Sequence, residues 1–336
     1  MQAKEPSRFE GGELAVVLSH YDLGVIESVT DFPRGSRRSP KVGIVCERGK
    51  YLLKRRTAVK APPDRLRFTH LVQRRLIESG FPAPRLSSTR HGEPYLQIRD
   101  HVYELFEFVP GEPYRHSVEE TRDAGVMLAR FHQWTEPLAE AWDGFPRGDY
   151  HDAPGVRTGL CSIGSSLSAH DSFSGDEAEL QSLLQFLLGA YDRAADAVKG
   201  AGYASWPEQI THADWHPGNL VFRKQAVVGV VDFDAMRLTR RLTDVGNGAL
   251  QFSMIASGDP ASWPAEYDAG RLTAFLEGYR SAWELTEPQV QSVFPLMIEA
   301  LIAECVAPIT ETGTVGRWSG FRVLQMARRK VAFLEG

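Results

Sequence analysis

The stretch Thr211-His212-Ala213-Asp214-Trp215-His216-Pro217-Gly218-Asn219-Leu220 decides how the rest of the chain is interpreted. It lies between the apolar runs Ala204–Ile210 and Leu220–Phe222, so we expect a loop that leads into a strand. An Asp on such a loop can orient a hydroxyl and accept its proton, and an Asn five residues later can turn back to a metal ion. The spacing therefore indicates phosphoryl transfer centred on Asp214. The alternative is a polar turn whose His and Asp cap neighbouring backbone.

A further pair of carboxylates follows in the run Val230-Val231-Asp232-Phe233-Asp234. The strand Val227–Val231 ends at Asp232, and a hairpin with the strand after Asn219 would return Asp232 to the loop. Oxygen ligands on adjacent strand ends suit a Mg²⁺ ion that also holds phosphate oxygens. We therefore predict that Asn219 and Asp232 are metal ligands. Asp234 could hold a second metal ion, contact the substrate or turn into solvent.

The chain resembles the aminoglycoside phosphotransferase and choline kinase superfamily, which includes homoserine-kinase-type members. The resemblance rests on the loop His212–Asn219 and on Asp232, and it extends over nearly the whole chain. It implies that Asp214 is the catalytic carboxylate, that Asn219 and Asp232 hold Mg²⁺ on the phosphates of ATP, and that His212 bonds backbone behind the loop. It also implies an α+β, protein-kinase-like fold with a small antiparallel β lobe carrying one helix and a larger, mainly helical C-terminal lobe.

Length and composition agree with this class. A chain of 336 residues with 43% hydrophobic and 24% charged content is long enough for two lobes, each with a core. The net charge of −5 gives no general attraction to nucleic acid or anionic lipid, so we expect neither partner. Three scattered cysteines favour a reduced, cytoplasmic protein. We expect no signal peptide and no run of membrane-spanning length.

The N-terminal part predicts a meander of short strands around one helix. The loop Asp31–Pro40 between the first two strands contains one glycine, Gly35, followed by Ser36, and the resemblance implies that it covers the ATP phosphates. It lacks the Gly-x-Gly-x-x-Gly of protein kinases, which favours the small-molecule branch, although a basic hairpin tip is the alternative. The predicted strands are Val25–Val29, Lys41–Cys46, Tyr51–Lys54, Tyr95–Ile98 and His101–Phe108.

Lys54 ends an apolar strand and is the candidate for holding the α and β phosphates, with an exposed lysine as the alternative. In kinases the next helix supplies a Glu that pairs with this lysine. The predicted helix Asp64–Gly80 has no Glu in the expected stretch Leu66–His70. Either Asp64 or Glu78 substitutes for it, or the pair is absent.

The segment Glu107–Glu112 resembles the hinge between kinase lobes, where backbone near Glu107 and Val109 would bond the adenine edge. The alternative is a plain exit from a strand into a turn. We therefore predict three regions, namely a nucleotide-binding lobe at 1–106, a hinge at 107–113, and a helical lobe with the catalytic loop and acceptor site at 114–336.

The resemblance places the acceptor between the catalytic loop and the later helices. From Asp244 to Glu311 there are ten carboxylates and two arginines, which favours a cationic acceptor. Glu299 and Glu304 lie roughly 140° apart on a helical wheel, so they cannot both face one pocket. The candidate acceptor contacts are Asp234, His216, Trp215, Glu299 and Glu304, although core packing is an alternative role for the tryptophan.

These features predict an ATP-dependent phosphotransferase that moves the γ-phosphate to a hydroxyl of an amino alcohol, amino sugar or amino acid. A protein Ser/Thr kinase is one alternative. Against it, His216 stands where such kinases usually carry Lys, Asp232-Phe233-Asp234 replaces Asp-Phe-Gly, and no Ala-Pro-Glu segment follows. The other alternative is a catalytically inactive nucleotide-binding scaffold, which the missing helix Glu favours and the presence of Asp214 disfavours.

Overall fold

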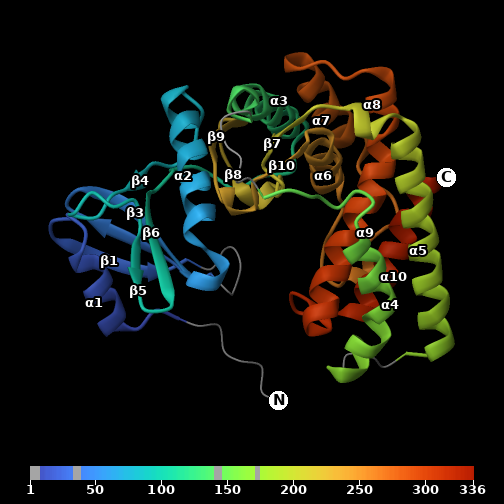
Figure 1. The fold of residues 1–336 in the computed structure, drawn as a ribbon, viewed down its shortest axis with the longest axis horizontal. Coiled ribbons are helices and arrows are strands. Elements are labelled where there is room, and N and C mark those ends of the chain that lie inside the picture. The colour runs from blue at the N-terminus through green and yellow to red at the C-terminus, as the bar shows by residue number, and fades with distance from the viewer. Residues whose placement is uncertain (1–7, 33–38, 140–145, 171–174) are drawn as a thin grey trace. The chain divides into compact units, whose positions relative to one another are not determined.

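The computed structural model describes residues 8–32, 39–139, 146–170 and 175–336 (Figure 1). The chain divides into two compact units. The N-terminal unit comprises Met1–Tyr114, Trp142–Phe145 and Gly218–Asp234, and the C-terminal unit comprises Arg115–Ala141, Pro146–Pro217 and Ala235–Gly336. The predicted regions keep 114–336 together, whereas this division groups the segment 218–234 with the N-terminal unit.

The N-terminal unit is built on a six-stranded antiparallel sheet with the order β1-β2-β3-β6-β4, in which β5 also pairs with β6. The hairpin of β8 and β9 belongs to the same unit. The strands are β1 (Ile26–Asp31), β2 (Lys41–Cys46), β3 (Gly49–Thr57), β4 (Leu86–Ser87), β5 (Leu96–Ile98), β6 (His101–Glu107), β8 (Leu220–Arg223) and β9 (Ala226–Val230).

Alternation along β2 places Val42 and Ile44 on the buried face of the sheet, where they join Leu53 of β3 and Leu105 of β6 in one apolar cluster. Helix α1 (Gly11–Ser19) adds its buried residues to this cluster. A second helix, α2 (Pro63–Glu78), follows β3. The prediction of one helix in this lobe is therefore wrong, because the apolar segment before β1 closes a helical turn with a capping box.

The C-terminal unit is mainly helical, and α9 packs most extensively against α4, α5, α6 and α10. Two short antiparallel pairs, β7–β10 and β11–β12, accompany the helices. The helices are α3 (Val118–Thr135), α4 (Pro154–Ala169), α5 (Glu177–Gly200), α6 (Leu242–Ser253), α7 (Ala269–Ala282), α8 (Glu287–Gln291), α9 (Val293–Thr312) and α10 (Gly320–Glu335). The strands are β7 (Glu208–Thr211), β10 (Arg237–Arg240), β11 (Thr314–Val315) and β12 (Trp318–Ser319).

Close packing of α3 on α7 depends on two glycines. A Cβ atom at Gly125 would lie 2.1 Å from the carbonyl oxygen of Phe275, and one at Gly278 would lie 2.0 Å from that of Arg122. Neither position has room for a side chain.

One segment of the C-terminal unit, Glu287–Thr312, is long and apolar enough to cross a membrane by length and composition alone. This corrects the expectation that no run reaches that length. In this chain 61% of its most apolar window is buried inside the protein, and the core helix of a globular unit passes the same test.

Candidate active site

The start of the predicted catalytic loop is held by Asp244, which is buried in the first turn of α6. Its Oδ2 accepts a hydrogen bond from the backbone N–H of His212 at 2.6 Å and lies 3.0 Å from Nε2 of His132. Its Oδ1 accepts from the backbone N–H of Ala213 at 2.7 Å. Ala213 has φ +59°, in the left-handed region that residues other than glycine rarely adopt. One carboxylate thus satisfies both backbone donors of this turn and secures its conformation.

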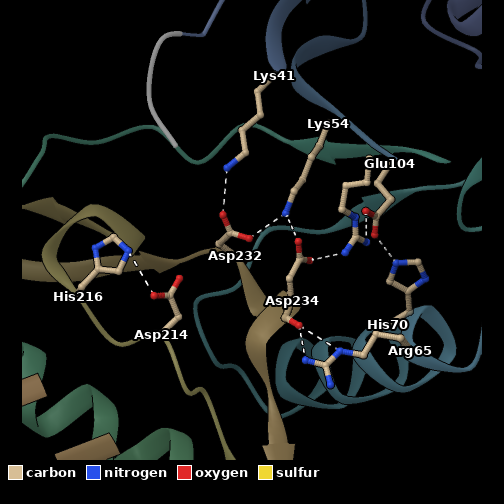
Figure 2. Close-up of polar contacts among 10 residues, drawn as sticks. Lys41, Lys54, Arg65, His70, Glu104, Asp214, His216, Asp232 and Asp234 are labelled. Atoms are coloured by element: carbon tan, nitrogen blue, oxygen red, sulfur yellow. Dashed lines mark hydrogen bonds and ion pairs between the residues drawn. The ribbon is translucent and has the colours of Figure 1, made fainter. Parts of the chain in front are cut away.

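The loop exposes Asp214 and His216 while it buries Trp215. The side chains of Asp214 and His216 are 47% and 36% exposed, and Nε2 of His216 lies 3.6 Å from Oδ1 of Asp214 (Figure 2). That distance is too long for a hydrogen bond but short enough for a charge interaction with a protonated imidazole. Trp215 is fully buried against Phe131 and His212, with ring centroids 6.3 and 5.4 Å away. The predicted contact of Trp215 with an acceptor does not agree with this burial.

In the N-terminal unit, the hairpin of β8 and β9 brings Asn219 and Asp232 close together along the two strands. The N–H of Val231 donates to the carbonyl oxygen of Asn219 at 2.9 Å, so the residue before Asp232 is bonded directly to Asn219. Asp232 itself has φ +67°. The hairpin that the sequence predicts is therefore present, and it ends in the predicted carboxylate.

Asp232 is paired with lysines of β2 and β3, and Asp234 is paired with a lysine and an arginine of β3 (Figure 2). Nζ of Lys54 lies 2.8 Å from Oδ1 of Asp232 and 2.5 Å from Oδ2 of Asp234, and Nζ of Lys41 lies 3.0 Å from Oδ2 of Asp232. Arg56 Nη1 lies 2.9 Å from Oδ1 of Asp234. Lys54 is buried, which excludes the alternative of a merely exposed lysine.

These pairs keep Lys54 and Asp232 ionised. Burial alone would lower the pKa of Lys54, but the charges of Asp234 and Asp232 offset it and raise the pKa above its ordinary value. Burial alone would raise the pKa of Asp232, yet Lys54 and Lys41 hold it far below the usual range. Asp232 is therefore an anion at neutral pH, as a metal ligand must be.

Helix α2 contributes basic groups at the place where a carboxylate is expected. His70 Nε2 lies 2.6 Å from Oε1 of Glu104 on β6, and Arg56 pairs with the other oxygen of the same carboxylate. Asp64 and Glu78, the two suggested substitutes for the missing Glu, interact instead with arginines of their own helix. Within the described residues, the carboxylates bonded to Lys54 come from the segment after β9.

Asn219 and Asp232 suit a divalent ion whose remaining ligands are not protein side chains. Across the described residues, no group of three or more His, Cys, Asp or Glu side chains is placed to hold a metal ion. One carboxylate and one amide oxygen would leave several positions for water and phosphate oxygens. That ligand set is typical of Mg²⁺ bound together with a nucleotide.

The other predicted nucleotide contacts are only partly covered by the structure. Gly35 and Ser36 lie outside the described residues. Glu107 is the last residue of β6, and its N–H donates to the carbonyl oxygen of Arg85 at 2.8 Å. Val109 lies so close to the β8–β9 hairpin that a Cβ atom at Gly229 would be 2.6 Å from its Cγ1. Adenine binding by Glu107 and Val109 stays a prediction.

The two candidate acceptor carboxylates of α9 have different surroundings. Glu299 is fully buried, and its oxygens accept from Nδ1 of His151 at 2.8 Å and from the N–H of Asp152 at 2.9 Å. Both oxygens thus have internal partners.

Glu304 is exposed, and its oxygens accept from Asn247 at 2.5 Å and Gln251 at 2.6 Å, one turn apart on α6. Partial loss of hydration against the surrounding protein raises the pKa of Glu304, the two amides lower it, and the negative charge of Asp214 raises it further. Glu304 therefore shares the electrostatic surroundings of Asp214.

Two functional residues were missed by sequence reasoning. Asp244 was counted only as one of the ten acidic residues after the loop, and Glu104 lay unnoticed in a predicted strand. The available signal is a carboxylate among apolar residues, Asp244 in α6 and Glu104 between Tyr103 and Leu105 in β6. Since Asp244 and Glu299 are buried and bonded internally, the acidic count also overstates the charge that a ligand would meet.

Comparisons with known proteins place the chain among phosphotransferases. The sequence profile of the phosphotransferase enzyme family matches residues 33–288. The homoserine kinase of Phenylobacterium zucineum (strain HLK1) is 28% identical over 282 residues, which cover 82% of this chain and 78% of that protein. A homoserine kinase of Bradyrhizobium sp. (strain BTAi1 / ATCC BAA-1182) is 26% identical over 225 residues, 66% of this chain and 62% of that protein. The chain therefore spans less than two thirds of the second relative.

Solved structures support the fold. An aminoglycoside phosphotransferase from Alicyclobacillus acidocaldarius subsp. acidocaldarius DSM 446 has a TM-score of 0.66 at 18% identity, covering 96% of this chain and 95% of that one. Amicoumacin kinase hAmiN, in complex with AMP-PNP, Ca²⁺ and Ami, has a TM-score of 0.66 at 15% identity, covering 97% and 94%. The predicted resemblance and the α+β, protein-kinase-like fold class are confirmed. From the match over residues 33–288, the chain belongs to the phosphotransferase enzyme family.

Proposed function

We propose that this protein transfers the γ-phosphate of ATP to a hydroxyl of a small amine-bearing molecule, with Asp214 as the catalytic carboxylate. The observation that carries the proposal is the state of the loop, in which a buried Asp244 fixes the backbone and Asp214 remains half-exposed. Asp214 would orient the acceptor hydroxyl and accept its proton as transfer proceeds.

On the nucleotide side, Lys54 would hold the α and β phosphates, and Asn219 and Asp232 would hold Mg²⁺. When bound, the metal ion would neutralise charge on the phosphate oxygens. Lys54 and Asp232 are both ionised and already 2.8 Å apart, which supports their assignment to one phosphate site. The loop with Gly35 and Ser36 and the backbone at Glu107 and Val109 complete the proposed nucleotide contacts.

On the acceptor side, Glu304 would bind the ammonium group and His216 would lie beside the hydroxyl. Glu304 is exposed, is oriented by two amides and is electrostatically coupled to Asp214. Glu299 and Trp215 are not part of the proposed acceptor site because both are fully buried. Homoserine, which the two named relatives phosphorylate according to their names, carries both a hydroxyl and an ammonium group.

We also propose that the protein works in the cytoplasm and needs neither nucleic acid nor a membrane. Its cysteines Cys46, Cys161 and Cys305 are unpaired with one another, which supports a reducing compartment.

A screen of ADP release tests the activity. The purified protein is given Mg²⁺-ATP and, in turn, homoserine, amino alcohols, amino sugars, neutral sugars and a generic protein substrate. We expect turnover with at least one hydroxylated amine, and a loss of several orders of magnitude in kcat for Asp214→Asn with nucleotide affinity retained. The matched control is Asp196→Asn, at a side chain that is 80% exposed. Normal turnover by Asp214→Asn sinks the assignment, and phosphorylation of protein alone favours a protein kinase.

The same screen tests the acceptor contact. We expect Glu304→Gln to raise KM for the best amine at least about tenfold, the cost of losing one charge-assisted contact, while KM for ATP stays unchanged. Efficient use of a neutral sugar with all amines inert would refute the role of Glu304 but leave the kinase activity intact.

A further inference from the structure

The carboxylate of Asp234 is bonded entirely by cations of β3. Lys54 Nζ lies 2.5 Å from one oxygen and Arg56 Nη1 lies 2.9 Å from the other. The backbone carbonyl of Asp234 also accepts from Arg65 of α2, whose Nε lies 3.1 Å away (Figure 2). Lys54 and Arg56 expose only 6% and 4% of their side chains, so the cations of these pairs are buried, whereas Asp234 is 32% exposed. Asp234 is therefore fixed at three points within the N-terminal unit.

Arg56 in turn depends on Glu104. Lys54 and Arg56 are two residues apart on β3, so their side chains leave the same face of the sheet. Glu104 stands directly opposite Lys54 in the β3–β6 register, and its carboxylate is shared by Arg56 and His70. Burial opposes ionisation of Glu104, but His70, Arg56 and Lys54 lower its pKa to about 2.

The result is a continuous series of bonded polar side chains. It runs from His70 on α2 through Glu104, Arg56 and Asp234 to Lys54, and ends at Asp232. A buried charge left without a partner is strongly unfavourable, so removing one inner member unbalances its neighbours. Without Arg56, the carboxylates of Asp234 and Glu104 would compete for the single ammonium of Lys54.

We propose that Arg56 is a positioning residue for the nucleotide lysine, acting by holding Asp234 so that this carboxylate orients Lys54 rather than binding a metal ion. Asp234 then does what a helix glutamate does elsewhere, and α2 supplies hydrogen-bond donors, Arg65 and His70, in place of a carboxylate. The inference rests on the proposed role of Lys54 in phosphate binding.

Calorimetric titration with AMP-PNP, without acceptor, in Mg²⁺ and again in EDTA, tests this. Arg56 acts on the position of Lys54, and Lys54 would contact the nucleotide phosphates whether or not Mg²⁺ is bound. We expect Arg56→Met and Asp234→Ala to weaken binding at least about tenfold under both conditions, as for the loss of a hydrogen bond to a charged group. Asp232→Ala should instead lose mainly the gain that Mg²⁺ provides.

The matched control is Arg55→Met. Arg55 is the next residue of β3, equally buried, and its Nη1 lies 2.6 Å from Glu13, so its loss tests stability without touching Lys54. We expect Arg55→Met to lower the melting temperature as Arg56→Met does, but to change AMP-PNP affinity less than twofold. If Arg56→Met does not fold, Arg56→Lys replaces it, since a single ammonium cannot bridge Asp234 and Glu104 as the guanidinium does.

Three results overturn the inference. In the first, Arg56→Met or Arg56→Lys binds AMP-PNP like the wild type. In the second, Asp234→Ala loses only the Mg²⁺-dependent part of the affinity, which makes Asp234 a metal ligand. In the third, the wild type binds no nucleotide in either buffer, which removes the proposed function as well and is recognised by the wild type alone.

Discussion

Replacing Asp244 by Ala should release the catalytic loop. The change removes the acceptor of two backbone N–H groups, the buried one of His212 and the partly buried one of Ala213, and the partner of His132. Each buried donor left unsatisfied costs about 1–3 kcal/mol. Ala213 holds a left-handed conformation that costs about 1 kcal/mol, and relief of this strain in the variant offsets part of the loss. We expect a total loss of about 3–5 kcal/mol, a large part of the 5–15 kcal/mol typical of a whole domain.

Urea unfolding measures the total loss of stability, and hydrogen exchange identifies the backbone amides that lose protection. We expect the amides of His212 and Ala213 to exchange faster in Asp244→Ala under native conditions, because their acceptor is gone. We expect kcat to fall with them, since Asp214 follows directly. Asp192→Ala is the control. Asp192 is 47% exposed and pairs only at the surface with Arg157, so the expected loss is below about 1 kcal/mol.

The assignment is refuted if the free energy of unfolding of Asp244→Ala is within about 1 kcal/mol of the wild-type value and the amides of His212 and Ala213 stay protected from hydrogen exchange. In that case another group holds the turn. Asp244→Asn adds a second comparison, because its amide can accept only through one oxygen and opposes a donor with its NH₂ group. A variant as stable as the wild type would show that the number of acceptors at this position is unimportant.

Two further predictions concern stability. Gly125→Ala should destabilise the protein by about 2 kcal/mol or more, because the new Cβ would clash with the carbonyl oxygen of Phe275. The control Gly155→Ala, whose Cβ would have no atom within 4 Å, should be neutral. Equal melting temperatures for the two variants would contradict the prediction. Glu104 has a folded-state pKa of about 2 against an ordinary 4.5, so its stabilisation, roughly 3 kcal/mol, is present above pH 4.5 and is lost as pH falls through about 2. Urea unfolding of wild type and Glu104→Gln should therefore converge between pH 4.5 and 2, and a constant difference contradicts the assignment.

Local patterns were sufficient for the parts of the site that follow one another along the chain. The run of apolar residues before Lys54 predicts a strand that buries this lysine; Lys54 is buried, although β3 continues to Thr57 instead of ending there. The hairpin between Asn219 and Asp232 was predicted from two apolar runs and the turn between them, and it is present. In both cases the elements are neighbours in sequence, so a period-2 pattern and turn residues contain the needed information.

Contacts between residues far apart in sequence cannot be predicted from such local patterns. Glu104 lies opposite Lys54 only because β6 pairs with β3 in one particular register, and a shift of one residue would turn Glu104 to the other face. Asp244 meets the catalytic loop across about thirty residues of chain, with no local mark of the contact. Helix α1 was missed for another reason, since its capping box uses Glu10 where Ser or Thr is usual.

The two sets of contacts also divide the proposed chemistry along the chain. Asp214 is secured by Asp244 inside the C-terminal unit, whereas Asp232 is secured by Lys41 and Lys54 inside the N-terminal unit. The networks have no residue in common, so a change in one should leave the hydrogen bonds of the other in place. We therefore expect replacement of Asp244 to lower kcat, and replacement of Arg56 to lower nucleotide affinity. The proposed catalytic carboxylate and the proposed metal ligand Asp232 are thus held in place by independent sets of side chains.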